Sequence, residues 1–139
     1  MSADIAVDTS ALVALAVREP DAEWFVQQLV DAEGRYVSAG TVQEFFVVLA
    51  SLHQQSGATP RSSRDYAMQI LASLNLVVEP VTAALALLGS AGIMRYRVAP
   101  AKLNFGDGFA YGLAKSHGIP LLCNGNDFPH TDLITLSPT

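Results

Sequence analysis

The sequence predicts an α/β fold in which a short parallel sheet lies between two layers of helices. Short apolar runs, which are typical of strands buried on both faces, alternate along the chain with longer segments of helical character. This alternation favours parallel βαβ units with helices on both sides of the sheet. The chain of 139 residues has the size of one domain, half of its residues are hydrophobic and only 15% are charged. We find no internal repeat, low-complexity tract or linker, so we expect a single α/β/α domain over residues 1–139.

Capping and turn residues mark the elements in the first half of the chain. We expect Thr9 or Ser10 to cap the first helix, and Gly34 and Gly57 to end later ones. Thr59-Pro60 combines an N-cap residue with proline at the first helical position. The predicted elements are a strand at 4–7, helices at 11–17 and from 20 to Gly34, a strand at 36–38, and helices at 41–55 and 60–73.

The second half continues the alternation. A strand is predicted at 76–78 and a helix from 82 to about 96, which Gly89 and Gly92 should weaken because glycine is a poor helix former. The remaining predicted elements are a helix at 105–117 and strands at 120–123 and 133–136.

Composition and charge exclude several classes of protein. The net charge of −5 argues against a generic nucleic-acid coat, although not against an enzyme that acts on nucleic acid through an acidic site. The longest uncharged run, at 80–94, has 15 residues and is too short for a membrane span. No basic segment followed by an apolar run opens the chain, and Cys123 is the only cysteine. We therefore expect a cytoplasmic protein that does not bind a membrane.

Four acidic residues fall at junctions between predicted strands and helices. Asp8 follows the first strand, Glu44 and Asp107 lie in the first turns of helices, and Asp127 lies in the loop after the strand at 120–123. In an open parallel sheet these junctions meet at the carboxyl edge, where such folds hold their sites. Converging carboxylates repel one another unless a cation is present, and Mg²⁺ or Mn²⁺ prefers oxygen ligands. The pattern predicts a divalent-metal site that could activate water for attack on phosphate.

Each acidic residue also has a purely structural interpretation. In chain order these are an N-cap (Asp8), a solvated helix residue (Glu44), a capping box with Asn104 (Asp107), an Asx-type turn (Asp127) and a solvated strand start (Asp132). Gly106 and Gly108 on either side of Asp107 favour function, because glycine costs ~1 kcal/mol relative to alanine within a helix. The three histidines have no zinc-ligand spacing.

Several segments together resemble the PIN-domain family, and more closely the VapC-type toxins of bacterial toxin–antitoxin pairs. The resemblance covers nearly the whole chain in the family's order and spacing. Its segments are Val7-Asp8-Thr9-Ser10-Ala11-Leu12, the helix with Glu44, Asn104-Phe-Gly-Asp107, and Gly125-Asn-Asp-Phe-Pro-His-Thr-Asp132. The first segment is weakly specific, whereas the last two together are specific.

The resemblance implies a PIN-like α/β/α fold and an Mg²⁺- or Mn²⁺-dependent endoribonuclease. It assigns Asp8, Glu44, Asp107 and Asp127 to the catalytic acidic quartet, with Asp8, Asp107 and Asp127 as the main metal ligands. The remaining positions are supporting ones: Asp132 beside the metal site, and Thr9, Ser10 and Thr131 as residues that orient a ligand or water. The chain departs from the family at Gly108, where a larger residue or cysteine is common, and this should loosen the helix start.

The resemblance also implies an RNA substrate, a cognate VapB-like antitoxin and a homodimer. An acidic protein needs local positive charge to hold RNA, and Arg95, Arg97 and Lys102 just before the Asn104 motif are the candidates. Their structural interpretation is that of solvated charges at a helix end. The hydrophobic helix at 41–55 and the uncharged segment 80–94 supply apolar surface compatible with an interface.

Two other functions remain open, and two are disfavoured. The acids could bind metal in a catalytically silent interaction module, or the enzyme could cut DNA, since backbone chemistry alone does not read the sugar. A response-regulator receiver needs a second acid near the first strand and a lysine after a late strand, but Asp8 has no acidic neighbour and Asn124 follows Cys123. An aspartyl-phosphate phosphatase needs Asp-x-Asp, and Ser10 occupies the second position.

Overall fold

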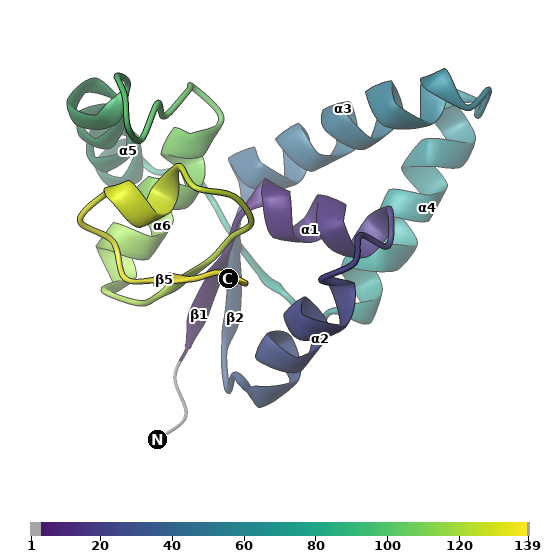
Figure 1. Ribbon diagram of the computed structural model, residues 1–139, viewed down its shortest axis with the longest axis horizontal. Coiled ribbons are helices and arrows are strands. Elements are labelled where there is room, and N and C mark those ends of the chain that lie inside the picture. Colours follow the sequence, from purple (N-terminus) through teal and green to yellow (C-terminus); the bar gives the residue numbers. More distant parts are fainter. Residues whose placement is uncertain (1–3, 139) are drawn as a thin grey trace.

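The computed structural model describes residues 4–138, which form a five-stranded parallel sheet covered by helices on both faces (Figure 1). The strand order is β3-β2-β1-β4-β5, so β1 is central and its carboxyl end lies between those of β2 and β4. All four pairings are parallel. The strands are β1 (Ile5–Val7), β2 (Arg35–Ser38), β3 (Val77–Glu79), β4 (Leu121–Leu122) and β5 (Thr135–Leu136). This architecture confirms the predicted α/β/α fold.

The helices divide into two layers that the central strand keeps apart. Ile5 and Val7 of β1 point into the core beneath α1 to α4, whereas Ala6 between them points into the core beneath α6. In Figure 1, α5 and α6 accordingly lie to the left of the sheet and α1 to α4 to the right. The helices are α1 (Thr9–Ala16), α2 (Ala22–Asp31), α3 (Ala39–Gln55), α4 (Pro60–Ser73), α5 (Ala83–Tyr96) and α6 (Asp107–His117), with a 3₁₀ turn η1 (Phe128–His130).

The starts of α1 and α3 differ from the sequence prediction because their N-caps lie earlier in the chain. Asp8, rather than Thr9 or Ser10, caps α1 by accepting a hydrogen bond from the Ser10 backbone N–H at 3.0 Å. Ser38 caps α3 by accepting one from the Gly40 N–H at 3.2 Å. Each helix thus begins two residues before its predicted start, and α4 begins and ends where predicted. In both corrected helices, the cap residue directly ends or follows a strand.

The glycines of α5 allow this helix to pack directly on α6. A β-carbon at Gly89 would lie 2.4 Å from the carbonyl oxygen of Gly108, and one at Gly112 would lie 2.7 Å from the carbonyl oxygen of Leu85. A β-carbon at Gly92 would overlap the ring of Tyr111. The prediction that Gly89 and Gly92 weaken this helix overlooked their role, which is to admit α6. Gly108, the residue after Asp107 at the start of α6, is buried in this contact.

The final strands are shorter than predicted. β4 comprises two residues of the four expected, and β5 begins at Thr135 instead of residue 133. Residues 128–130 form the 3₁₀ turn, and hydrogen bonds of the Thr131 hydroxyl hold the chain that follows it in an irregular conformation. Within residues 4–138, no helix has the length and hydropathy required to cross a membrane.

Candidate active site

A cleft of about 390 Å³ opens at the carboxyl edge of the sheet, where α1, α3 and α6 begin. Its polar lining comes from segments far apart in the sequence, because strand order places the end of β1 beside the end of β4. The polar and charged lining residues are Asp8, Thr9, Ser10, Glu19, Glu44, Asp107 and Asn124. Three of the four predicted quartet members therefore share one cleft.

The two carboxylate oxygens of Asp8 differ in their hydrogen bonding. Oδ2 accepts hydrogen bonds from the Ser10 backbone N–H at 3.0 Å and from the Ser10 hydroxyl at 2.6 Å. Oδ1 is buried and has no hydrogen-bond partner among the described residues. Burial, and then the nearby negative charge of Glu44, raise the pKa of Asp8 above its usual value despite the bonds from Ser10. One oxygen thus caps α1, and the other is a buried acceptor that no described residue satisfies.

Glu44 reaches the cleft from the second turn of α3. The Thr9 hydroxyl donates a hydrogen bond to Glu44 Oε1, which orients the carboxylate next to the start of α1. The same carboxylate lies so close to Gly106 that a β-carbon there would be 1.7 Å from Oε2. This contact explains the glycine before Asp107: it makes room for the side chain of Glu44.

Asp107 begins α6 and forms the predicted capping box with Asn104. Its Oδ2 accepts from the Asn104 backbone N–H at 2.9 Å, and Asn104 Oδ1 accepts from the Asp107 N–H at 3.1 Å. Burial raises the pKa of Asp107 to about 7, with further contributions from the negative charges of Asp8, Glu44 and Asp127. The capping box therefore holds a carboxyl group in a cleft that disfavours its ionised form.

The segment after β4 contributes Asn124 to the lining of the cleft. Its backbone N–H donates to the Ser10 hydroxyl at 2.9 Å, and its side-chain Nδ2 donates to Glu19 Oε2 at 2.9 Å. Ser10 thus connects this segment to Asp8, which supports the expectation that it orients the site. The cleft position of Glu19 was missed at the sequence level, because no motif surrounds this residue in the turn between α1 and α2.

Asp127 is the quartet member that does not line the cleft. It is exposed, directly before η1, and its backbone oxygen accepts from the His130 N–H at 3.3 Å. Its charge is nevertheless among those that raise the pKa of Asp107. Its role as a metal ligand stays a prediction.

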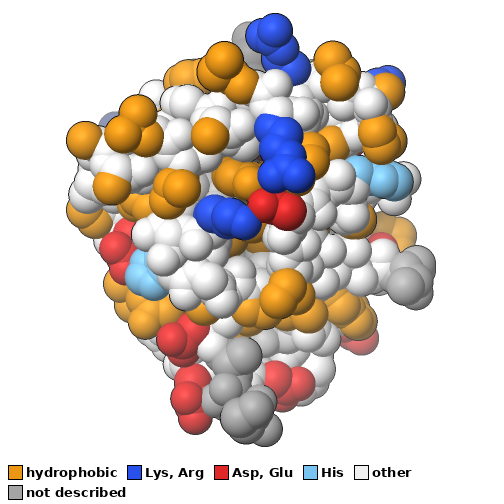
Figure 2. Space-filling model, turned by 90° about the vertical axis from the view of Figure 1, so that its left-hand side faces the viewer, with side chains coloured by type: hydrophobic (Ala, Val, Ile, Leu, Met, Phe, Trp, Pro, Cys, Tyr) orange, Lys and Arg blue, Asp and Glu red, His pale blue; other side chains and the backbone are white. Residues whose placement is uncertain are grey.

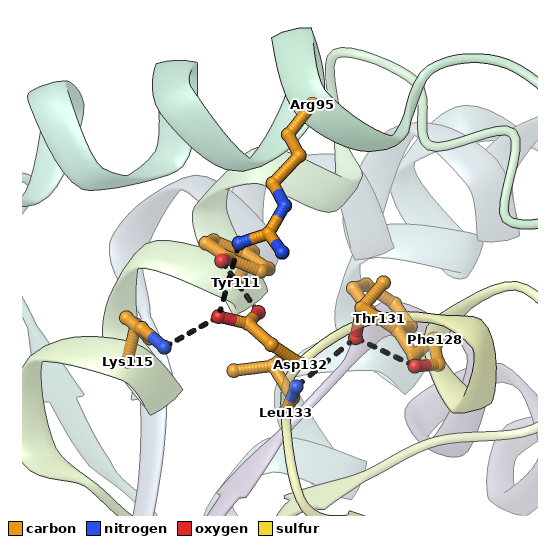
Figure 3. Close-up of polar contacts among 7 residues, drawn as sticks. All are labelled: Arg95, Tyr111, Lys115, Phe128, Thr131, Asp132 and Leu133. Carbon is orange, nitrogen blue, oxygen red and sulfur yellow. Dashed lines mark hydrogen bonds and ion pairs between the residues drawn. The ribbon is translucent and has the colours of Figure 1, made fainter.

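Thr131 and Asp132 do not line the cleft, and their side chains form hydrogen bonds with other parts of the protein (Figure 3). The Thr131 hydroxyl donates to the Phe128 carbonyl at 2.6 Å and accepts from the Leu133 N–H at 3.3 Å. Asp132 accepts from the Tyr111 hydroxyl at 2.7 Å and from Lys115 Nζ at 2.6 Å. The hydrogen bond from Lys115 is the main reason that the pKa of Asp132 lies below its usual value.

The three candidate RNA-binding residues lie in and after the end of α5. Arg95 Nη1 is 3.8 Å from Asp132 Oδ2, and its guanidinium lies 4.9 Å from the ring centroid of Tyr96. Arg97 and Lys102 are exposed, and neither forms a salt bridge with a described residue. Figure 2 shows this side of the molecule, where basic side chains gather around an acidic one.

The cleft suits a hard divalent cation. Within residues 4–138, no three His, Cys, Asp or Glu side chains are gathered closely enough to enclose an ion. Mg²⁺ needs no such cage, because it usually keeps several waters and binds one or two carboxylates. The partnerless Asp8 Oδ1 and the raised pKa of Asp107 are the features that a cation would relieve. The carboxylates of Asp8, Glu44 and Asp107 that line the cleft offer only oxygen donors, the type that Mg²⁺ and Mn²⁺ prefer.

A parallel sheet with acidic side chains at its carboxyl edge occurs in several classes of protein, and comparison with known families identifies the class to which this chain belongs. Residues 5–133 match the family model described as "PIN domain". The chain therefore belongs to the PIN-domain family.

Within this family, curated relatives of the chain include VapC ribonucleases. "Ribonuclease VapC30" of Mycobacterium tuberculosis is 37% identical over 135 residues, covering 94% of this chain and 97% of the relative. "Ribonuclease VapC28" of the same species is 39% identical over 128 residues, covering 90% and 92%. The predicted resemblance to VapC-type toxins is confirmed.

Solved structures with the same fold include a toxin and VapBC complexes. M. tuberculosis VapC20, described as a "Sarcin-Ricin loop cleaving toxin", has a TM-score of 0.73 at 18% identity, with 96% of this chain and 99% of that chain covered. VapBC2 from Rickettsia felis, bound to a DNA fragment from its promoter, has a TM-score of 0.71 at 13% identity, with 96% and 98% covered. At these identities, the likeness establishes the fold alone.

Proposed function

We propose that this protein is a VapC-type endoribonuclease toxin that hydrolyses RNA phosphodiester bonds with the help of Mg²⁺ or Mn²⁺. The observation that carries the proposal is that Oδ1 of Asp8 is buried without a hydrogen-bond partner within residues 4–138, in a cleft that Glu44 and Asp107 also line. The 37–39% identity to named ribonucleases over at least 90% of the chain supports the reaction class.

Each cleft residue has a distinct task in this proposal. Asp8 and Asp107 would hold the cation, and Ser10 fixes the orientation of Asp8 through its two hydrogen bonds. Thr9 aims the Glu44 carboxylate into the cleft, where it can accept a proton from the attacking water or hold that water in place. The cation, when bound, would activate water and offset the charge of the phosphate. Asp127 supplies a further carboxylate from the neighbouring loop.

The substrate strand would approach past the end of α5. Arg97 and Lys102 are exposed and not engaged in salt bridges with described residues, so both are available to phosphates. Arg95 Nη1 lies 3.8 Å from Asp132 Oδ2, so this carboxylate offsets the charge of Arg95 and weakens its attraction for phosphate.

The partners proposed are a VapB-like antitoxin and a second copy of the chain. Toxin–antitoxin complexes among the structural neighbours support the first. Exposed apolar side chains on α5, Leu87 at 73% and Met94 at 71%, support an interface, and Figure 2 shows hydrophobic side chains gathered over the upper part of this face. We place the protein in the cytoplasm, where the buried thiol of Cys123 would stay reduced.

Cleavage of matched single-stranded RNA and DNA by the purified chain tests the reaction. We expect RNA to be cut with Mg²⁺ or Mn²⁺ and to stay intact with a chelator. Cutting of DNA alone would establish the DNA-nuclease alternative. A folded protein that binds Mn²⁺ and cuts neither substrate would establish the silent metal-binding module, and cutting in chelator would refute the metal-dependent mechanism.

A further inference from the structure

Asp132 lies outside the cleft, but its carboxylate joins the loop that carries Asp127 to the helix that carries Asp107. We infer that Asp132 is a positioning residue, which holds loop 124–131 against α6 and thereby keeps Asp127 beside Asp107. This inference rests on the proposed function for its consequence, metal binding. Its structural part, the tethering of the loop, can be measured without any activity.

The contacts of Asp132 occupy both of its carboxylate oxygens. Oδ1 accepts from the Tyr111 hydroxyl at 2.7 Å, and Oδ2 accepts from Lys115 Nζ at 2.6 Å (Figure 3). Oδ2 is also 3.8 Å from Arg95 Nη1 of α5. With both oxygens bound to cationic or hydroxyl groups, Asp132 is not free to bind a cation in the cleft. Its effect on the site must pass through the chain that it holds.

The residues that hold Asp132 continue the side of α6 on which Asp107 lies. Tyr111 and Lys115 follow Asp107 by four and eight residues, which is about one and two helical turns. Tyr111 is buried, and its ring occupies the space that a side chain at Gly92 would need. The anchor on α6 is therefore rigid, and it is built into the same helix face as the metal-site carboxylate.

The loop has a second anchor at its other end, so Asp127 lies between two fixed points. Asn124 is held by the Ser10 hydroxyl and by Glu19. After Asp127, the buried ring of Phe128 and the hydrogen bonds of Thr131 shape the turn that leads into Asp132. Loss of the Asp132 contacts would release one end of this loop and let Asp127 move away from Asp107.

Tyr111→Phe and Asp132→Asn separate tethering from direct metal binding. Tyr111→Phe keeps the buried ring and removes only the hydroxyl, which lies outside the cleft. Glu79→Gln is the matched control, because the Glu79 and Asp132 side chains are both 28% exposed and both pair with a basic residue of α6. If Asp132 acts through the loop, both tether variants should affect Mn²⁺ binding. If it binds the ion directly, only Asp132→Asn should.

Amide hydrogen exchange of the metal-free protein measures the tether. We expect the peptide covering residues 125–133 to exchange about 5-fold faster in Tyr111→Phe, as the loss of one hydrogen bond implies, and faster still in Asp132→Asn. Glu79→Gln should leave this peptide unchanged. Unchanged exchange in both tether variants would overturn the inference, whether or not the protein proves to be a nuclease.

Mn²⁺ titration of the same variants measures the consequence for the site. We expect about 10-fold weaker binding for Asp132→Asn, a smaller loss for Tyr111→Phe, and wild-type affinity for Glu79→Gln. Weaker binding in Asp132→Asn alone would identify a direct ligand and overturn the positioning role. If the wild-type protein binds Mn²⁺ without cutting RNA, the proposed function fails while both measurements still decide this inference.

Discussion

The geometry of the site requires a glycine at position 106. The residue before Asp107 has no space for a side chain, because the Glu44 carboxylate lies where a β-carbon would be. The glycine therefore allows α3 to deliver Glu44 to the start of α6. At this scale the structural and functional interpretations of the sequence are not alternatives, since Asp8 caps α1 with one carboxylate oxygen and also lines the cleft.

Gly106→Ala should displace Glu44 and reduce the RNA cleavage rate by about 100-fold, as a misplacement near 1 Å can do. The fold should persist, because the Glu44 side chain can swing away. A double-mutant cycle measures the mechanism: in the background of Glu44→Gln, the alanine should cost little more. Fully additive losses would show that Gly106 acts on something other than Glu44.

Asp107 should give the metal-free protein a stability that falls as pH rises. Its pKa is raised from 3.8 in the unfolded chain to about 7 in the folded protein. The folded state therefore binds the proton more tightly, and stability falls between about pH 4 and pH 7. Asp107→Asn should flatten this part of the pH profile in denaturant unfolding with chelator present. An unchanged profile would mean that Asp107 is not the group responsible.

At the scale of elements, the contact between α5 and α6 fixes where Asp107 sits. The sequence periodicity was enough to predict both helices, but not this contact, because glycines in a helix are locally unfavourable and only the partner helix explains them. The cleft position of Glu19 and the hydrogen bonds of Asp132 could not be predicted either, because these contacts join residues distant in sequence. By contrast, the positions of Asp8 and Asp107 were predictable from local sequence, because Asp8 directly follows an apolar strand and Asp107 stands three residues after the cap residue Asn104.

Gly112→Ala should destabilise the protein by about 1–3 kcal/mol, because its β-carbon would be forced against the Leu85 carbonyl of α5. Ala91→Ser on the exposed side of α5 is a suitable control and should stay within about 0.5 kcal/mol of wild type. Urea unfolding followed by circular dichroism measures both. A destabilisation by Gly112→Ala no larger than that of the control would show that the helices can separate without cost.

For the whole molecule, the distribution of charge matters more than its total. The net charge is −5, but residues 80–106 contain three basic and no acidic residues. This segment ends directly before Asp107, so the basic part of an acidic protein leads in sequence into the candidate active site. A strand of RNA can be attracted there while the rest of the surface remains unfavourable to it.

Arg97→Glu should weaken RNA binding and reduce the salt dependence of the binding constant by about one phosphate contact. The measurement is a salt titration of RNA affinity in an Asp8→Asn background, so that the substrate stays intact. Arg61→Glu, which reverses an exposed charge on α4, is the matched control. Equal effects of the two reversals would place Arg97 outside the RNA path.

The site assignment is tested most directly by the RNA cleavage rate of Asp8→Asn beside Asp65→Asn, in Mg²⁺ and in Mn²⁺. Asp65 is an exposed acid of α4 and serves as the matched control, with unfolding curves to verify that both variants fold. We predict a loss of at least about 100-fold for Asp8→Asn and a wild-type rate for Asp65→Asn. A folded Asp8→Asn protein that cuts RNA at the wild-type rate would contradict this prediction.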